Sequence, residues 1–71
     1  MRIGKYVHKM LQENNIPVQK LSKSLNIQLS EILKWQNSNP PDNVLHQIAS
    51  FFGQSLEDFF FMLAKRFYIR S

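Results

Sequence analysis

Side chains able to perform acid–base or metal chemistry are few in this sequence. His8 and His46 lie on different predicted helices, and there is no cysteine to complete a metal site. The neighbouring carboxylates Glu57 and Asp58 stand where a helix dipole favours negative charge, so their position has a structural explanation. Neither a Gly-rich phosphate loop nor a nucleophile elbow is present. The sequence therefore predicts no enzymatic activity, no metal site and no bound cofactor.

A second kind of chemistry, hydrogen bonding to a partner, is concentrated in and just after the stretch NIQLSEILKW, residues 26–35. On a helical wheel, Ile32 and Trp35 fall close to Gln28 and face inward, and Glu31 borders this buried side. The outward face mixes hydrogen-bonding, charged and aliphatic side chains: Leu29, Ser30, Leu33, Lys34 and Asn37. A face of this kind favours contact with another molecule over burial in the chain's own core.

The elements that must position this face are helices, because apolar residues recur at helical spacing along the whole chain. Pro17 suits the first turn of a helix, and Pro40 and Pro41 forbid continuation of the one before them. Asp42 is a favourable N-cap, and Gly53 a favourable helix end. The expected helices span residues 3–14, 17–25, 28–37, 42–52 and 55–68. We therefore expect an all-α fold and a single domain over residues 1–71.

Composition and charge narrow the class of protein. A hydrophobic fraction of 44% in 71 residues predicts a folded unit. Nine Lys and Arg residues against five Asp and Glu give a formal net charge of +4, which favours a polyanionic partner. The first residues lack the apolar run of a signal peptide, and the longest apolar run is too short to span a membrane. The expected location is the cytoplasm, in association with the nucleoid, with no membrane partner.

Several short segments together form a recognisable order: IPVQKLS at 16–22, LNI at 25–27, ILKWQ at 32–36, Ile48-Ala49 and LED at 56–58. From residue 3 to about residue 60 this order resembles the lambda-repressor-like, or Cro/repressor-type (XRE), helix-turn-helix family of DNA-binding proteins. The resemblance implies a five-helix lambda-repressor-like domain. It also implies transcription regulation through duplex DNA, bound by the second and third helices.

The family's contact positions can be carried over to this chain one by one. The resemblance implies base-edge contacts at Leu29, Ser30 and Lys34, and contacts to the DNA backbone at Val18 and Asn37. The family commonly has Gln at the position of Val18 and Gln or Arg at that of Leu29. Neither aliphatic side chain can make those hydrogen bonds, so we expect weak or shape-dominated sequence specificity.

Two groups of side chains leave alternatives open. Gln28 begins the third helix, while Lys20 and Lys23 face outward on the second, where they either neutralise phosphates or simply solubilise the surface. Leu29 and Leu33 form an aliphatic pair on the presumed functional face. Their partner is thymine methyl groups, another protein, or a helix of the same chain.

The last predicted helix has apolar residues on two sides. One side is expected to face the core: Leu56, Phe59, Phe60, Leu63 and Phe67. The other carries Phe61, Met62, Tyr68 and Ile69. We expect this second side to form a homodimer interface, which in the family also sets the spacing of two recognition helices on a palindromic site. The alternative is that the last turns fold back and bury these residues within the monomer.

The sequence is compatible with two functions. The first is a small dimeric transcriptional regulator that binds duplex DNA. The second is a protein-interaction module on the same scaffold, such as a co-regulator or an antitoxin-like partner. Lys65, Arg66 and Arg70 make the tail basic, and either phosphate contacts or simple solvation would explain them.

Overall fold

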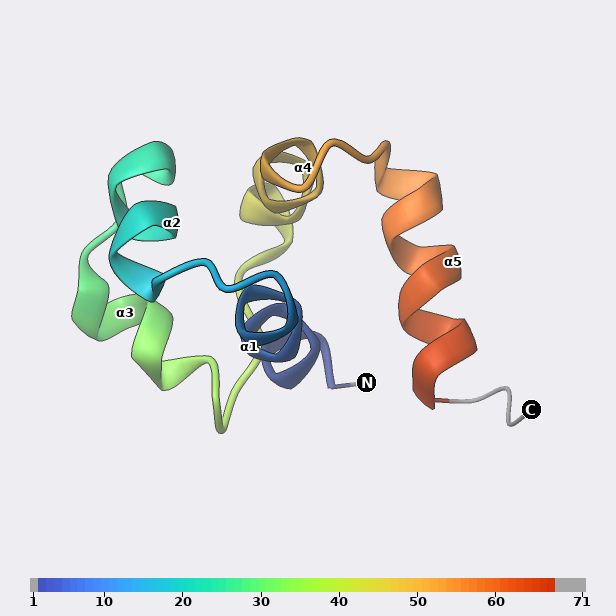
Figure 1. Ribbon diagram of the computed structural model, residues 1–71, viewed down its shortest axis with the longest axis horizontal. Helices are drawn as coiled ribbons and strands as arrows, with labels where there is room; N and C mark the ends of the chain where they lie inside the picture. Colours follow the sequence, from blue (N-terminus) through green and yellow to red (C-terminus); the bar gives the residue numbers. More distant parts are fainter. Residues whose placement is uncertain (1, 68–71) are drawn as a thin grey trace.

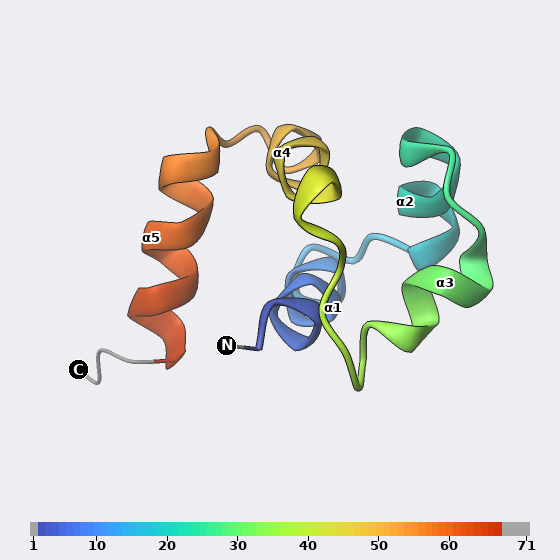
Figure 2. The same cartoon turned by 180° about the vertical axis from the view of Figure 1, so that it is seen from behind.

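The computed structural model describes residues 2–67, and every regular element within them is an α-helix (Figure 1). The helices are α1 Ile3–Glu13, α2 Val18–Leu25, α3 Leu29–Lys34, α4 Asp42–Phe51 and α5 Leu56–Phe67. The expected all-α class is therefore confirmed for this part of the chain. Figures 1 and 2 show α1 and α4 in the middle, with α2 and α3 on one side of them and α5 on the other.

Three helix ends are set by residues in the left-handed conformation. Asn15 and Asn26 both have a φ of 56°, and Gly53 has a φ of 72°. Asparagine and glycine are the residues that tolerate this region best. The chain therefore leaves α1, α2 and α4 close to the positions that the sequence predicts.

Helix starts agree with the sequence at α5 but not at α4. The backbone N–H of Asp58 donates to the Ser55 hydroxyl at 3.1 Å, which is the expected capping bond. At α4 the expected cap is wrong, because Pro41 occupies the N-cap position and Asp42 is the first helical residue, with no side-chain cap bond. The Asp42 carboxylate can still favour the helix through the positive end of its dipole.

α3 is shorter than expected, with six residues in place of the predicted range 28–37. After Lys34 the backbone N–H groups of Trp35, Gln36 and Asn37 bond to carbonyls three residues back, a tighter pattern than that of an α-helix. Pro40 disfavours helical geometry at Asn39 before it, so the helix cannot continue beyond this turn. A tight turn therefore follows α3 where a straight helix was expected.

The core consists of apolar side chains from all five helices: Ile3, Tyr6, Val7, Leu11, Leu21, Ile32, Trp35, Leu45, Ile48, Ala49, Phe59 and Leu63. Trp35 is the largest fully buried side chain, and its indole Nε1 has no hydrogen-bond partner among the described residues. An orphaned buried donor costs about 1–3 kcal/mol. Burial of an indole gains roughly 4–6 kcal/mol at about 25 cal/mol per Å². Packing therefore outweighs the missing bond.

α1 approaches the end of α3 so closely that only glycine fits at the contact. Gly4 is buried, and a Cβ atom built on it would overlap the carbonyl oxygens of Trp35 and Ser38. The backbone N–H of Gly4 also donates to Oδ1 of Asn39 at 3.3 Å, so a side chain from the segment after α3 caps the first turn of α1. This contact fixes the position of α3 relative to α1.

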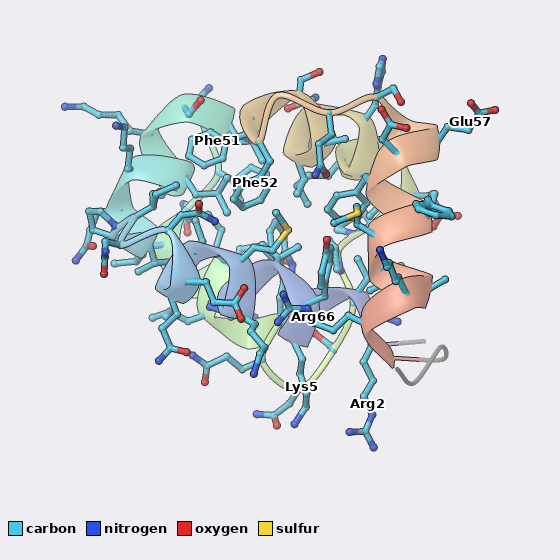
Figure 3. The ribbon with its side chains drawn as sticks, turned by 45° about the vertical axis from the view of Figure 1, so that its right-hand side comes forward. Arg2, Lys5, Phe51, Phe52, Glu57 and Arg66 are labelled. Atoms are coloured by element: carbon cyan, nitrogen blue, oxygen red, sulfur yellow. The ribbon has the colours of Figure 1, made fainter. Side chains whose placement is uncertain are left out.

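An aromatic contact and an ion pair join α5 to α1. The rings of Tyr6 and Phe59 meet edge to face with centroids 5.3 Å apart. Both guanidinium nitrogens of Arg66 donate to the Glu13 carboxylate, at 2.6 and 2.9 Å, and Figure 3 shows Arg66 extending from α5 toward α1. This bidentate pair, more than the burial that opposes it, holds the pKa of the Glu13 carboxyl below its usual value.

The inward side of α5 differs in part from the expected one. Phe59 and Leu63 are fully buried and Phe60 is partly buried, as predicted. Leu56 is exposed, so its assignment to the core is wrong: it is the first residue of the helix, beyond the reach of the packed neighbours. The side chain of Phe67 lies outside the described residues. None of the helices within residues 2–67 has the length and apolar character that a bilayer span needs.

The α1–α3 contact predicts the effect of Gly4→Ala. Helix propensity alone would make alanine more stable by about 0.5–1 kcal/mol. Because the new methyl group would overlap two backbone carbonyls, we expect instead a loss of roughly 1–3 kcal/mol in the free energy of unfolding. Urea denaturation followed by the fluorescence of Trp35 measures this directly. Gln12→Ala, at an exposed position of α1, is the control, and a Gly4→Ala variant as stable as this control would contradict the close approach.

Candidate nucleic-acid interface

The turn between α2 and α3 is closed by two hydrogen bonds to one residue. The Ile27 N–H donates to the Ser22 carbonyl at 3.1 Å, and the Ser22 hydroxyl donates to the Ile27 carbonyl at 2.5 Å. Asn26, in the left-handed conformation between them, reverses the chain. The pair of helices is therefore held at a fixed angle by local bonds, and the outward face of α3 has a defined direction relative to α2.

α3 is also supported from its inner side by α1. The ring Nε2 of His8 donates to the Ile32 carbonyl at 2.8 Å, which requires a proton on that nitrogen. Ile32 and Trp35 are fully buried beneath the helix, as the wheel predicts. Ser38 adds a bond from its hydroxyl to the Lys34 carbonyl at 2.9 Å. Each of these contacts leaves the opposite face of α3 available.

That opposite face carries most of the predicted contact residues. Gln28, Ser30, Lys34 and Asn37 are all exposed, and the Gln28 side chain makes no capping hydrogen bond to α3. Hydroxyl, ammonium and amide groups can each donate a hydrogen bond to a base edge or to a phosphate. Glu31 is exposed as well, one position before the buried Ile32, so α3 also carries an acid.

The predicted aliphatic pair on α3 is uneven. The side chain of Leu33 is 43% exposed, whereas Leu29 is only half-buried and does not stand fully in solvent. Leu29 is the first residue of α3, next to the turn that joins it to α2. Leu33 is therefore the main apolar contact that this face offers to a partner.

On α2, the predicted contact residues lie in two different environments. Lys20 and Lys23 are exposed, as expected of charges that contact phosphates or simply solvate the surface. Val18 is partly buried against the core and lines a hollow beside α1, so it contributes packing and no hydrogen bond. The lysines and Val18 therefore do not make one continuous polar surface.

Two hollows next to α1 were not anticipated from the sequence. The larger, about 440 Å³, is lined by Lys5, His8, Lys9, Leu11, Gln12, Ile16, Val18 and Gln36. The smaller, about 280 Å³, is lined by Arg2, Lys5, Gln36, Asn37, Ser38 and Asn39. The four-residue spacing of Lys5 and Lys9 puts both on one side of the first helix, so the sequence could have indicated a cationic face there. The sequence could not show that the turn after α3 completes the same surface.

The expected dimer surface is described only in part. The side chain of Phe61 is 60% exposed and that of Met62 is 42% exposed, so both stand on the outer side of α5 as predicted. Tyr68 and Ile69 lie outside the described residues. The helix that carries these two exposed apolar side chains, α5, lies on the opposite side of the molecule from α3 in Figure 1.

No group of three or more His, Cys, Asp or Glu side chains within residues 2–67 is placed to hold a metal ion. Comparison of the chain with protein-family models, with curated proteins and with solved structures gave no match.

The bonded turn between α2 and α3 predicts the effect of Ser22→Ala. Loss of the hydroxyl leaves one hydrogen bond fewer to the Ile27 carbonyl, so we expect a decrease of about 1 kcal/mol in the free energy of unfolding. We also expect faster amide exchange at Ile27 and in α3. Chemical denaturation and hydrogen exchange measure the two effects. Ser24→Ala, at an exposed position of the same helix, is the control. Equal stability and equal amide exchange of the two variants would contradict a stabilising bond between the Ser22 hydroxyl and the Ile27 carbonyl.

Proposed function

We propose that this protein is a small transcriptional regulator that binds duplex DNA through α2 and α3, on a lambda-repressor-like helix-turn-helix scaffold. One observation carries the proposal: α3 is held from its inner side by α1 while its outer side presents exposed donors. Ser30 and Lys34 stand on that outer side, and Asn37 follows in the next turn. A rigid helix with a free polar face is what insertion into a major groove requires.

The chemistry of this face indicates what kind of recognition it performs. Ser30 and Asn37 can donate to base edges or phosphates, and Lys34 can reach either. Leu33 suits the methyl group of thymine, the apolar feature of the major groove. Because this face has no Arg, and its amides stand only before and after α3, at Gln28 and Asn37, most of the affinity comes from charge and shape, and sequence discrimination is modest.

A homodimer is part of this proposal. Phe61 and Met62 are exposed on α5, on the other side of the molecule from α3. Two copies joined through this surface would present two recognition helices related by a two-fold axis. The DNA site would then contain two related half-sites at a fixed spacing.

Selection of duplexes from a random-sequence pool at low salt tests the proposal and reveals any palindromy in the same experiment. We expect enrichment, with affinity that falls steeply as salt rises. Lys34→Ala should weaken binding several-fold and reduce the slope of log affinity against log salt by about 0.9 if Lys34 contacts a phosphate. Lys65→Ala, an exposed lysine on α5, is the matched control. If the protein retains no duplex above the level of a neutral protein, the proposal fails.

The exposure of Leu33 favours one alternative, a protein-interaction module on the same scaffold. An aliphatic side chain that is 43% exposed beside half-buried Leu29 fits an apolar partner surface as well as a thymine methyl. In this function the partner is a protein, and the α3 face contributes burial in place of base contacts.

The double substitution Leu29→Lys, Leu33→Lys separates the two functions. In a protein-interaction module, added charge at the centre of the apolar contact should abolish partner binding, with an unchanged helical circular dichroism spectrum. In a DNA-binding protein, two extra cations on the same face should strengthen non-specific duplex binding. Partner binding that survives the substitution excludes this surface as its site.

A further inference from the structure

We propose that the outward side of α1, together with the turn after α3, binds the sugar–phosphate backbone of the same duplex that α3 faces. We call this surface the α1 groove and define it by Arg2, Lys5, Lys9, Gln12, Gln36 and Asn37. The inference rests on the proposed duplex binding and adds a second contact region, on a helix outside the helix-turn-helix pair.

The groove is one continuous surface built from two hollows. Lys5 and Gln36 line both of them, so the hollows adjoin along the middle of the surface. The larger extends toward Lys9 and the smaller toward Arg2. Figure 3 shows Arg2 and Lys5 extending from one edge of the molecule, away from its body.

The charges in the groove have one sign. Among the described residues that line the two hollows, three are cationic and none is acidic. The ion pair found within residues 2–67 joins Arg66 to Glu13, and it leaves the three groove cations without a salt bridge. Lys9 acts on Glu13 only as a weaker, more distant charge that helps to lower its pKa, since both carboxylate oxygens are taken by Arg66. The groove is therefore a site of uncompensated positive charge.

The amides in the groove add hydrogen-bond donors between the cations. Gln12 reaches the surface from α1, while Gln36 and Asn37 reach it from the turn after α3. Ammonium and amide groups placed at intervals along a hollow are the partners that successive phosphates use, and they distinguish no base. This pattern fits a linear polyanion better than a single small anion.

The two lysines of α1 repel each other, and Glu13, which attracts Lys9, is itself paired with Arg66. Lys5 and Lys9 are four residues apart on one helix face, where like charges repel and weaken the helix. Neither makes a contact that stabilises the core, because both are exposed. A phosphate strand alongside α1 would remove this repulsion.

The position of the groove points to duplex DNA as its occupant. Asn37 is exposed in the turn directly after α3 and lines the smaller hollow, so the hollow adjoins the end of α3. A helix inserted in a major groove of about 12 Å width has a phosphate strand on each side of it. Lys20 and Lys23 are exposed on α2, and the α1 groove adds cations from a third helix. The groove also lies beside Val18, where α2 itself supplies no donor.

The test compares the full chain with two variants of equal net charge. Lys5→Gln, Lys9→Gln lowers the net charge by two within the groove, and Lys65→Glu lowers it by two on α5, outside the groove. Affinity for a random-sequence duplex is measured by fluorescence anisotropy between about 50 and 200 mM salt. Circular dichroism and the fluorescence of Trp35 verify that each variant is folded. Lys5→Arg, Lys9→Arg keeps the charge and should bind as the unchanged protein does.

Two lost phosphate contacts should reduce the salt slope by about 1.8, so across this range the unchanged protein loses about tenfold more affinity than the groove variant does. The Lys65→Glu control should keep the original slope. If the groove variant and this control have the same salt slope while the unchanged protein binds duplex, the α1 groove does not contact phosphates, and the proposed function stands. If the unchanged protein binds no duplex, both fail. Binding to phosphatidylserine vesicles in place of duplex, lost in the groove variant, would assign the groove to lipid headgroups and overturn the proposal.

Discussion

The contact between the first turn of α1 and the end of α3 is the constraint on which the arrangement of this protein depends. α3 has only six residues, and isolated helices shorter than about 12–15 residues are marginal in water. Its direction must therefore come from tertiary contacts. Gly4 lets the backbone of α1 reach the carbonyls after α3, His8 bonds to a carbonyl within α3, and Trp35 fills the space beneath. The outer face of α3 is exposed because its inner face is held in these three ways.

The parts of this arrangement that could be predicted from sequence are those that depend on local spacing. The helical wheel correctly places Ile32 and Trp35 inside, since both belong to one short helix and share a face. The asparagines at 15 and 26 mark helix ends because their preference for the left-handed conformation is a property of the residue itself. For the same reason, the all-α class and the approximate helix ranges follow from apolar periodicity.

The contacts that hold α3 could not be predicted, because they join residues far apart in the chain. The bond from Gly4 to Asn39 spans 35 residues, and the bond from His8 to Ile32 spans 24. In the sequence, a glycine within a helical stretch indicates only a weak helix former. Gly4 is required because the backbone after α3 lies against it, and the sequence does not reveal this neighbour. The exposure of Leu56 and the partial burial of Leu29 have a related cause. A helical wheel gives the direction of each side chain, but it does not show how far the neighbouring helices extend beside it.

In the proposed DNA-binding function, the charges of the molecule divide two tasks between different helices. On α3 the exposed cation Lys34 is accompanied by the exposed acid Glu31, so this helix brings no net charge toward a polyanion. Its contribution is shape and a few hydrogen-bond donors. Attraction must then come from the flanking helices: α2 carries Lys20 and Lys23, and the two hollows of the α1 groove are lined by cations and by no acid. Because charge contacts phosphates irrespective of sequence, a surface divided in this way favours salt-dependent and sequence-tolerant binding, and the proposed dimer would have to supply specificity through half-site spacing.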